Sequence, residues 1–218
     1  MVVKLGLANA FDRVKHDFLF QVMIRFRFSP SFFNWVKACI SSPWIAPLVN
    51  GRAAIFFQAF RGIQQGCPLS PLLYDIQASA LSFQMEHCWL QKGLLGLKIA
   101  IGVKDFNHAQ FTDDTLMLNG PISIIAKKFK HKLDLYKVAS GRKINLSKSQ
   151  IYGWNVSPQE MTSISQILEI EGNMQWENFK YLEIPIFKTS PKNSRYTIAG
   201  SQACMFIKVP SLSPQNES

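Results

Sequence analysis

The sequence predicts an α+β domain in which helices back a mainly antiparallel sheet. Three observations lead to this class. Some stretches carry apolar residues spaced by three or four, others are short apolar runs of strand length, and the two kinds do not alternate regularly as in βαβ folds. The 218 residues are 47% hydrophobic, which is enough to fill a core and argues against a disordered chain.

The first third of the chain predicts a strand, two helices and a hairpin. Ser29-Pro30 is typical of an N-cap followed by the first residue of a helix. Asn50-Gly51-Arg52 separates two apolar runs and is a strong tight-turn signal. The expected elements are a strand at 2–7, helices at 15–26 and 30–40, and hairpin strands at 44–49 and 53–60.

The middle of the chain predicts a long helix and then short strands. A loop rich in Gly and Pro precedes the helix, and Asp113-Asp114 falls between two apolar stretches. The expected elements are a loop at 61–71, a helix ending near 90, and strands at 96–103, 109–111 and 115–118.

The last third predicts two more helices and two strands. Apolar residues from Ile122 to Tyr136 form one helical face, and Gly141 is a typical helix stop. Ser157 is suited to cap the next helix. The expected elements are strands at 150–155 and 181–187, a helix at 157–169, and a frayed tail beyond 209.

The charge is strongly positive and unevenly distributed. Lys and Arg number 24 against 14 acidic residues, which gives a net charge of +10. The stretch 127–148 holds eight basic residues and only Asp134 as an acid. This excess favours a polyanionic partner, nucleic acid above all, although an ordinary basic surface has the same composition. No apolar stretch reaches 18 residues and no signal peptide is evident, so we expect no membrane and a nuclear or cytoplasmic location.

Phe111-Thr112-Asp113-Asp114 is the first candidate for chemistry. Two carboxylates on a strand–turn–strand can hold a hard cation such as Mg²⁺, which shares its other positions with substrate phosphates. Asp-Asp is also a common turn dipeptide, so alone it leaves both interpretations open.

Five segments, in order, resemble the reverse transcriptases of non-LTR (LINE-type) retrotransposons. The segments are 4–12 (KLGLANAFD), 61–74 (RGIQQGCPLSPLLY), 111–114 (FTDD), 140–149 (SGRKINLSKS) and 181–186 (YLEIPI). In that family they build the palm, an antiparallel sheet backed by helices. The resemblance implies a palm-like domain over 1–190, whose part 121–190 holds a basic helix and the start of the thumb-proximal region. Residues 191–218 are then a poorly ordered, divergent tail.

The resemblance also implies partners and site residues. The partners are an RNA template, a DNA primer and deoxynucleotide triphosphates, and the cofactor is Mg²⁺, with Mn²⁺ as a substitute. Asp113 and Asp114 would be the catalytic, metal-binding residues of a two-metal nucleotidyl transfer. Nucleotide-binding residues would be Phe11, Gln65, Gly66, Pro68 and Lys143. Nucleic-acid-binding residues would be Arg61, Gly62, Lys127, Lys128, Arg142 and Lys148. Phe11 is equally suited to a core, and each Lys to a solvated face.

The first motif departs from the family at its key position. The pattern Asp-x-x-x-Ala-Phe-Asp reads Gly6-Leu7-Ala8-Asn9-Ala10-Phe11-Asp12, so the first metal-binding Asp is replaced by Gly6. Asp12 is interpreted instead as a helix-start residue that satisfies backbone donors. Milder departures are Cys67 for Asp, Thr112 for Ala and Glu183 for Gly.

The expected function follows from both the likeness and the departures. The chain is interpreted as a reverse transcriptase fragment that lacks most of the fingers and thumb and is catalytically inactive. Gly6→Asp alone is not expected to restore activity. The alternatives are a non-catalytic basic protein that binds RNA or DNA, and a pseudogene product without function.

Overall fold

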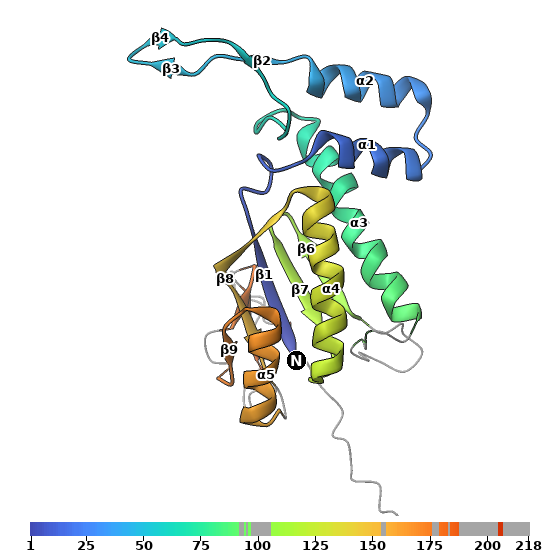
Figure 1. Cartoon of the computed structure of the whole chain (residues 1–218), viewed down its shortest axis with the longest axis vertical. Helices are drawn as coiled ribbons and strands as arrows, with labels where there is room; N and C mark the ends of the chain where they lie inside the picture. Colours follow the sequence, from blue (N-terminus) through green and yellow to red (C-terminus); the bar gives the residue numbers. More distant parts are fainter. Residues whose placement is uncertain are drawn as a thin grey trace, which may run out of the picture.

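A five-stranded sheet forms the centre of the computed structural model (Figure 1), which describes residues 1–91, 94, 96, 106–153, 156–175, 179–182, 184–187 and 205–206. The strands lie in the order β6-β7-β1-β8-β9. Their bounds are β1 Val2–Ala8, β6 His108–Phe111, β7 Asp114–Leu118, β8 Lys143–Tyr152 and β9 Gly172–Asn173. The α+β class predicted from the sequence is confirmed.

The sheet is mixed rather than wholly antiparallel. β6, β7, β1 and β8 pair antiparallel, but β9 joins β8 in parallel. The parallel pair arises because α5 crosses between β8 and β9 and returns the chain in the same direction. The expectation of an antiparallel sheet is therefore wrong at this edge.

Three helices cover one face of the sheet. They are α3 Ser70–Leu90, α4 Ser123–Ser140 and α5 Pro158–Leu168. Their apolar residues, such as Met85, Phe129 and Ile164, are buried with Val3 and Leu5 of β1 in one cluster. On the opposite face a smaller cluster joins Val2, Leu116, Leu118 and Tyr152 to Phe179 and Tyr181. Alternate residues of β1 thus face different layers, as strand geometry requires.

Two further helices and a hairpin extend beyond one end of the sheet (Figure 1). The helices are α1 His16–Arg25 and α2 Pro30–Ser41, and both form where the sequence predicts them. The Ser29 hydroxyl accepts from the Phe32 amide at the start of α2, and Ser157 does the same for Glu160 in α5. Gly141 ends α4 in the left-handed conformation at φ 77°.

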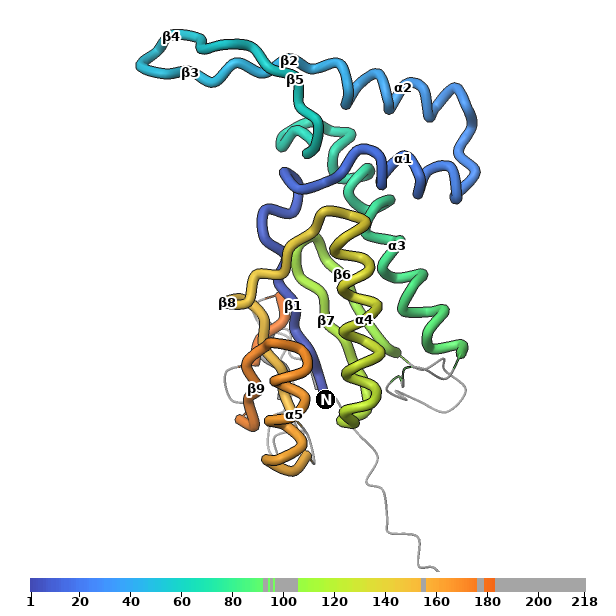
Figure 2. The backbone as a smooth tube through the Cα atoms, in the orientation of Figure 1, coloured from blue at the N-terminus to red at the C-terminus, as the bar shows by residue number. Residues whose placement is uncertain are grey.

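The hairpin is a long ribbon that projects from the body of the molecule (Figure 2). Its strands are β2 Trp44–Ile45, β3 Leu48–Val49, β4 Arg52–Ala53 and β5 Phe57–Gln58. The turn consists of Asn50 and Gly51 at φ 51° and 76°, so Arg52 belongs to the strand rather than to the predicted turn. Many of its large apolar side chains are exposed, including Trp44, Leu48, Ile55, Phe56 and Phe60.

Some predicted strands have different bounds. The strand expected at 150–155 begins seven residues earlier, at Lys143. The strand expected at 181–187 is two strands, β10 Lys180–Tyr181 and β11 Ile184–Phe187, and Leu182 between them has φ 52°. A short strand, β12 Met205–Phe206, pairs with β11. The strand predicted at 96–103 and the tail beyond 209 lie outside the described residues, apart from Gly96.

Candidate functional site

The Asp113-Asp114 pair lies at a tight turn held on two sides. β6 and β7 join through Thr112 and Asp113, since Phe111 pairs with Asp114. The Leu7 amide of β1 donates to the Asp113 carbonyl at 2.8 Å, and the Tyr74 hydroxyl of α3 donates to the Thr112 carbonyl. Thr112 has φ 45°, a conformation that such two-residue turns require. The turn is thus fixed both to the central strand and to the long helix.

The two carboxylates have different surroundings. Asp113 lines a cavity that Phe11, Gln65 and Lys148 also line, whereas Asp114 does not. Asp114 pairs with Gly6 of β1 and lies on the same face of β7 as Leu116 and Leu118, which cluster with Tyr181. Burial raises the pKa of Tyr181, and the charge of Asp114 raises it further. Asp114 is therefore close enough to Tyr181 to influence its ionisation.

A cavity of about 660 Å³ brings together most of the predicted nucleotide-binding residues. Its walls come from the end of β1, the loop before α3, the turn after β6, and β8. The predicted site residues that line it are Phe11, Gln65, Gly66, Pro68, Asp113 and Lys148. Segments far apart in the sequence thus converge where the sequence analysis expects one site.

Phe11 forms one wall of this cavity and rests on an aromatic support. Its ring stacks on Tyr74 with 4.8 Å between centroids and 27° between planes. Burial raises the pKa of the Tyr74 hydroxyl, so this group remains a neutral hydrogen-bond donor. Phe11 also packs partly against the core formed by α1 and α3. Both interpretations of Phe11, a cavity wall and a core ring, therefore apply.

The loop before α3 depends on glycine at its start. Gly62 has φ 87°, and a Cβ there would lie 3.0 Å from the Asp12 carbonyl oxygen. Its amide donates to the Val14 carbonyl at 2.7 Å, and the His16 ring contacts its carbonyl at 2.7 Å. Gly62 therefore serves close backbone packing in this structure.

Asp12 does not start a helix, contrary to the sequence-based expectation. It lies in the turn after β1, whereas α1 begins at His16 with Lys15 as its N-cap. The exposed Asp12 carboxylate accepts instead from the Gln65 side-chain amide at 3.3 Å. Gln65 is thus tied to the first motif by a side-chain hydrogen bond.

Gly6 lies next to the carboxylate pair, but the space for a side chain is filled. Its Cα pairs with that of Asp114, so an Asp at this position would stand beside the turn. A Cβ built on Gly6 would lie 2.7 Å from Lys148 Cβ and 3.6 Å from Lys148 Cδ. The first distance is shorter than two carbon atoms tolerate, so the stem of Lys148 excludes an Asp unless the backbone moves.

A bulge in β8 brings Lys148 to this place. Between the pairs Lys4–Gln150 and Gly6–Asn145, β1 advances two residues while β8 advances five. The Asn145 side chain accepts from the Ser147 amide and hydroxyl, at 3.1 and 2.6 Å. The Ser149 hydroxyl donates to the Asn145 carbonyl at 2.7 Å and accepts from the Gly6 amide at 3.1 Å. The bulge therefore satisfies the amide that the interrupted ladder leaves unpaired.

Arg142 is buried rather than available to a nucleic acid, contrary to expectation. Only 3% of its surface is exposed. Its guanidinium donates to the Ala10 carbonyl at 2.8 Å and to the Gln77 side chain at 2.9 Å, and lies 4.2 Å from the centroid of the Tyr74 ring. Arg142 thus ties the first motif to α3 from inside.

The remaining basic residues are distributed over the surface. Lys143 is exposed on β8 and does not line the cavity at Asp113. Arg61 is exposed beside a second cavity that also includes Asp12 and Gln65. Lys127 and Lys128 are exposed in the first half of α4. The far end of the helix lies beside Lys15, whose amide donates to the Ser140 carbonyl at 3.3 Å.

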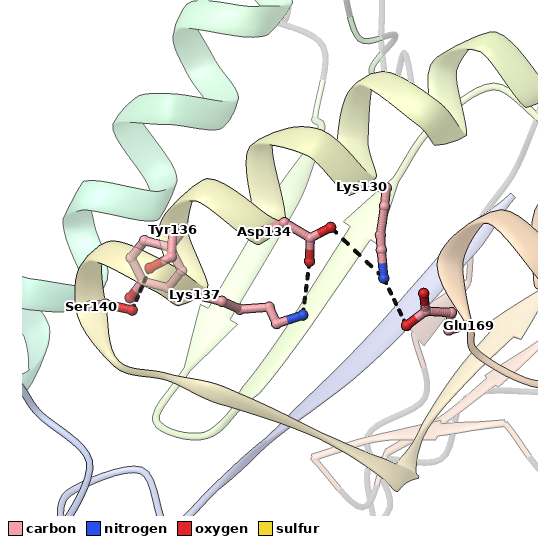
Figure 3. Close-up of polar contacts among 6 residues, drawn as sticks. All are labelled: Lys130, Asp134, Tyr136, Lys137, Ser140 and Glu169. Carbon is pink, nitrogen blue, oxygen red and sulfur yellow. Dashed lines mark hydrogen bonds and ion pairs between the residues drawn. The ribbon is translucent and has the colours of Figure 1, made fainter.

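Some lysines of the basic run 127–148 form ion pairs with acidic residues of the same chain (Figure 3). Lys130 pairs with Glu169 after α5 at 3.0 Å and with Asp134 at 3.9 Å, and Lys137 pairs with Asp134 at 2.8 Å. The run therefore does not act as one continuous free surface.

The donor set around the turn does not fit a pair of metal ions. Within the described part of the chain, no group of three or more His, Cys, Asp or Glu side chains could hold a metal ion. Gly6 lacks the oxygen that would complete such a group, and Lys148 covers it.

Sequence reasoning missed Tyr74, Asn145 and Ser149. All three fall inside the matched motifs, and only Asn145, a polar residue between Ile144 and Leu146, carried a local signal.

Comparison with known proteins identifies the family. The profile of "Reverse transcriptase (RNA-dependent DNA polymerase)" matches residues 1–186. The chain belongs to this family. The reverse transcriptase match covers the cavity and all its lining residues.

Similar proteins include those of transposable elements. The chain is 28% identical over 147 residues to the transposon TX1 uncharacterized 149 kDa protein of Xenopus laevis, covering 67% of this chain and 11% of that protein. It is 31% identical over 75 residues to the retrovirus-related Pol polyprotein from type-1 retrotransposable element R2 of Popillia japonica, covering 34% and 12%. The chain thus spans about a tenth of the length of these relatives.

Among solved structures, an apo telomerase from Candida tropicalis, truncated from its C-terminal domain, aligns with a TM-score of 0.49. The identity is 15%, over 68% of this chain and 29% of the telomerase. In addition, none of the helices in the described residues is both long and apolar enough to cross a membrane.

Proposed function

We propose that the chain is the palm-like part of a non-LTR retrotransposon reverse transcriptase, and that it binds template and primer but does not synthesise DNA. The observation that carries this proposal is the convergence of the family motifs on one cavity, lined by Phe11, Gln65, Gly66, Pro68 and Asp113. The family match over residues 1–186 supplies the reaction class.

The family reaction joins a primer 3′-hydroxyl to the α-phosphate of a deoxynucleotide and releases pyrophosphate. Such a transfer depends on preorganised positive charge at the phosphates, commonly from two Mg²⁺ or Mn²⁺ ions. Here the position beside Asp114 is Gly6, and Lys148 covers it. Asp113 and Asp114 alone therefore do not provide the expected set of metal-binding carboxylates, and this misfit supports the proposed lack of polymerase activity.

The proposed roles of the remaining residues follow their positions. Phe11 packs against the sugar of a nucleotide in the cavity, where a 2′-hydroxyl would collide with the ring. Gln65, Gly66 and Pro68 form the cavity wall beneath the nucleotide. Gly66 has no side chain, so the backbone can approach the ligand closely there. Arg61, Lys127, Lys128 and Lys143 contact phosphates of the template or primer from the surface, and Gly62 shapes the loop. Because template RNA and primer DNA occur in the nucleus and the cytoplasm, we expect the chain to act in one of these compartments.

A binding function without any nucleotide site is the second candidate, because Lys127, Lys128 and Lys143 are exposed cations outside the cavity. Such binding would be salt-sensitive and independent of the motif residues.

The deciding experiment measures binding and primer extension together. We expect a labelled RNA template with a DNA primer to bind in anisotropy titrations, with affinity falling steeply as salt rises. We expect no extension with Mg²⁺ or Mn²⁺. Extension that Asp113→Asn abolishes would overturn the proposed inactivity. A folded chain that binds no nucleic acid would overturn the whole proposal and favour a decayed copy without function.

A further inference from the structure

We propose that the cavity at Asp113 binds the phosphate groups of a nucleotide through Lys148, without a divalent cation. The inference rests on the proposed function only in that the ligand is a nucleoside triphosphate. It changes how that ligand is held, because a lysine ammonium group takes the place of the metal ions that the family uses.

The first step is the exclusion of a carboxylate by Lys148. Two carbons of its stem, Cβ and Cδ, lie within 4 Å of the place where a Gly6 side chain would begin. Gly6 itself is buried and pairs with Asp114. Lys148 can therefore occupy this position because Gly6 has no side chain.

The second step is that the bulge holds Lys148 in place. Lys148 lies between Ser147 and Ser149, which each hydrogen-bond to Asn145. The Ser149 hydroxyl also accepts a hydrogen bond from the Gly6 amide. Ser149 is 1% exposed, so this anchor is shielded from water. The backbone at Lys148 is thus tied to the central strand, in contrast to a lysine on a free loop.

The third step concerns charge. Lys148 is exposed and lines the cavity, and no carboxylate of the described residues lies within ion-pair distance of its ammonium group. Asp113 is the one acidic residue among the cavity-lining residues. The positive charge of the Lys148 ammonium group repels a divalent cation near it and attracts an anion. Lysine is a common phosphate ligand that acts as a point charge.

The remaining walls suit the other parts of a nucleotide. Phe11 offers an aromatic surface backed by Tyr74, and Asn145 and Gln65 add polar groups. The volume of about 660 Å³ falls within the range of small-ligand sites. The cavity therefore fits an anion that carries a sugar and a base better than a bare phosphate.

The test is the binding of dATP to the whole chain by calorimetry, with EDTA or with Mg²⁺. We expect binding in EDTA that Mg²⁺ does not tighten. Lys148→Met keeps the aliphatic stem over Gly6 and removes the charge, so it should weaken dATP binding at least tenfold, as expected for loss of a charge-assisted hydrogen bond. Lys37→Met is the control, because Lys37 is an exposed lysine on α2 outside the cavity, and this variant should bind dATP as the parent does. Thermal melting of both variants checks that they fold.

The outcomes separate this inference from the proposed function. Binding that requires Mg²⁺, or that Lys148→Met leaves unchanged, overturns the inference while template–primer binding can still stand. Binding of dATP in EDTA by a chain that ignores template and primer supports the inference and overturns the proposed function. Inorganic triphosphate as a second probe should compete with dATP, and its failure to compete would contradict recognition through phosphate.

Discussion

Gly6 and Lys148 together determine the chemistry available beside the Asp113-Asp114 turn. A sequence comparison at position 6 alone suggests a lost ligand that one substitution could restore. The structure adds that Lys148 Cβ would lie 2.7 Å from any new Cβ at this position. The change at position 6 and the bulge of β8 therefore have to be considered as a pair.

Gly6→Asp should destabilise the protein and restore no polymerase activity. The overpacked strand costs about 1–3 kcal/mol of unfolding free energy, to be measured by urea denaturation. Lys148→Gly in the same chain removes the clashing Cβ, so the double variant should be more stable than the two separate effects predict. A Gly6→Asp protein as stable as the parent would contradict the steric coupling.

At the scale of the secondary-structure element, α4 connects the sheet to the site end of the molecule. Its apolar stripe is buried in the core, and its last residue, Ser140, accepts a hydrogen bond at its carbonyl from the amide of Lys15, the N-cap of α1. Tyr136 lies on this stripe, edge-on to Phe18 at 5.9 Å. Burial raises the pKa of Tyr136 to about 12.

The buried Tyr136 predicts a loss of stability at alkaline pH. In the unfolded chain a tyrosine ionises near pH 10, but the folded protein holds Tyr136 neutral up to about 12. Its contribution is complete below pH 10 and is lost as the pH rises toward 12, by about 2–3 kcal/mol. Urea denaturation at pH 8 to 11.5 measures this decline, and Tyr136→Phe should make it less steep. An identical decline in both proteins would contradict the assignment.

The sequence predicted the elements well where local signals are strong. The caps at Ser29 and Ser157, the stop at Gly141 and the Asn50-Gly51 turn are local features, and each lies where it was expected. Long-range packing was not predictable in the same way. Arg142 belongs to a basic run, yet it is buried because Ala10, Gln77 and Tyr74 supply partners from distant segments.

The same reason applies to the site. The likeness to the family pointed to six residues that line the cavity, because their motifs are contiguous in sequence; they are Phe11, Gln65, Gly66, Pro68, Asp113 and Lys148. The bulge of β8 depends on pairing with β1 some 140 residues away, and no local signal marks it. The occupation of the Gly6 site by Lys148 could therefore only be found from the structure.

At the scale of the whole molecule, the apolar surface is concentrated on the projecting ribbon. Leu48, Ile55 and Phe60 are each more than 70% exposed, although the described chain has a well-packed core at the sheet. Exposed apolar surface of this kind promotes association. The positive charge of the whole chain, +10, opposes it only through long-range repulsion that salt screens.

The ribbon should therefore control self-association without affecting the fold. Replacing Leu48, Ile55 and Phe60 by Thr should lower the fraction of associated protein in sedimentation velocity, most clearly at high salt. Exposed substitutions of this kind typically change stability by about 0.5 kcal/mol or less each, so the melting temperature should remain close to that of the parent. Val138→Thr on α4 is the matched control, since Val138 is 75% exposed but lies outside the ribbon. If the control reduces association as much as the triple variant, the ribbon is not its source.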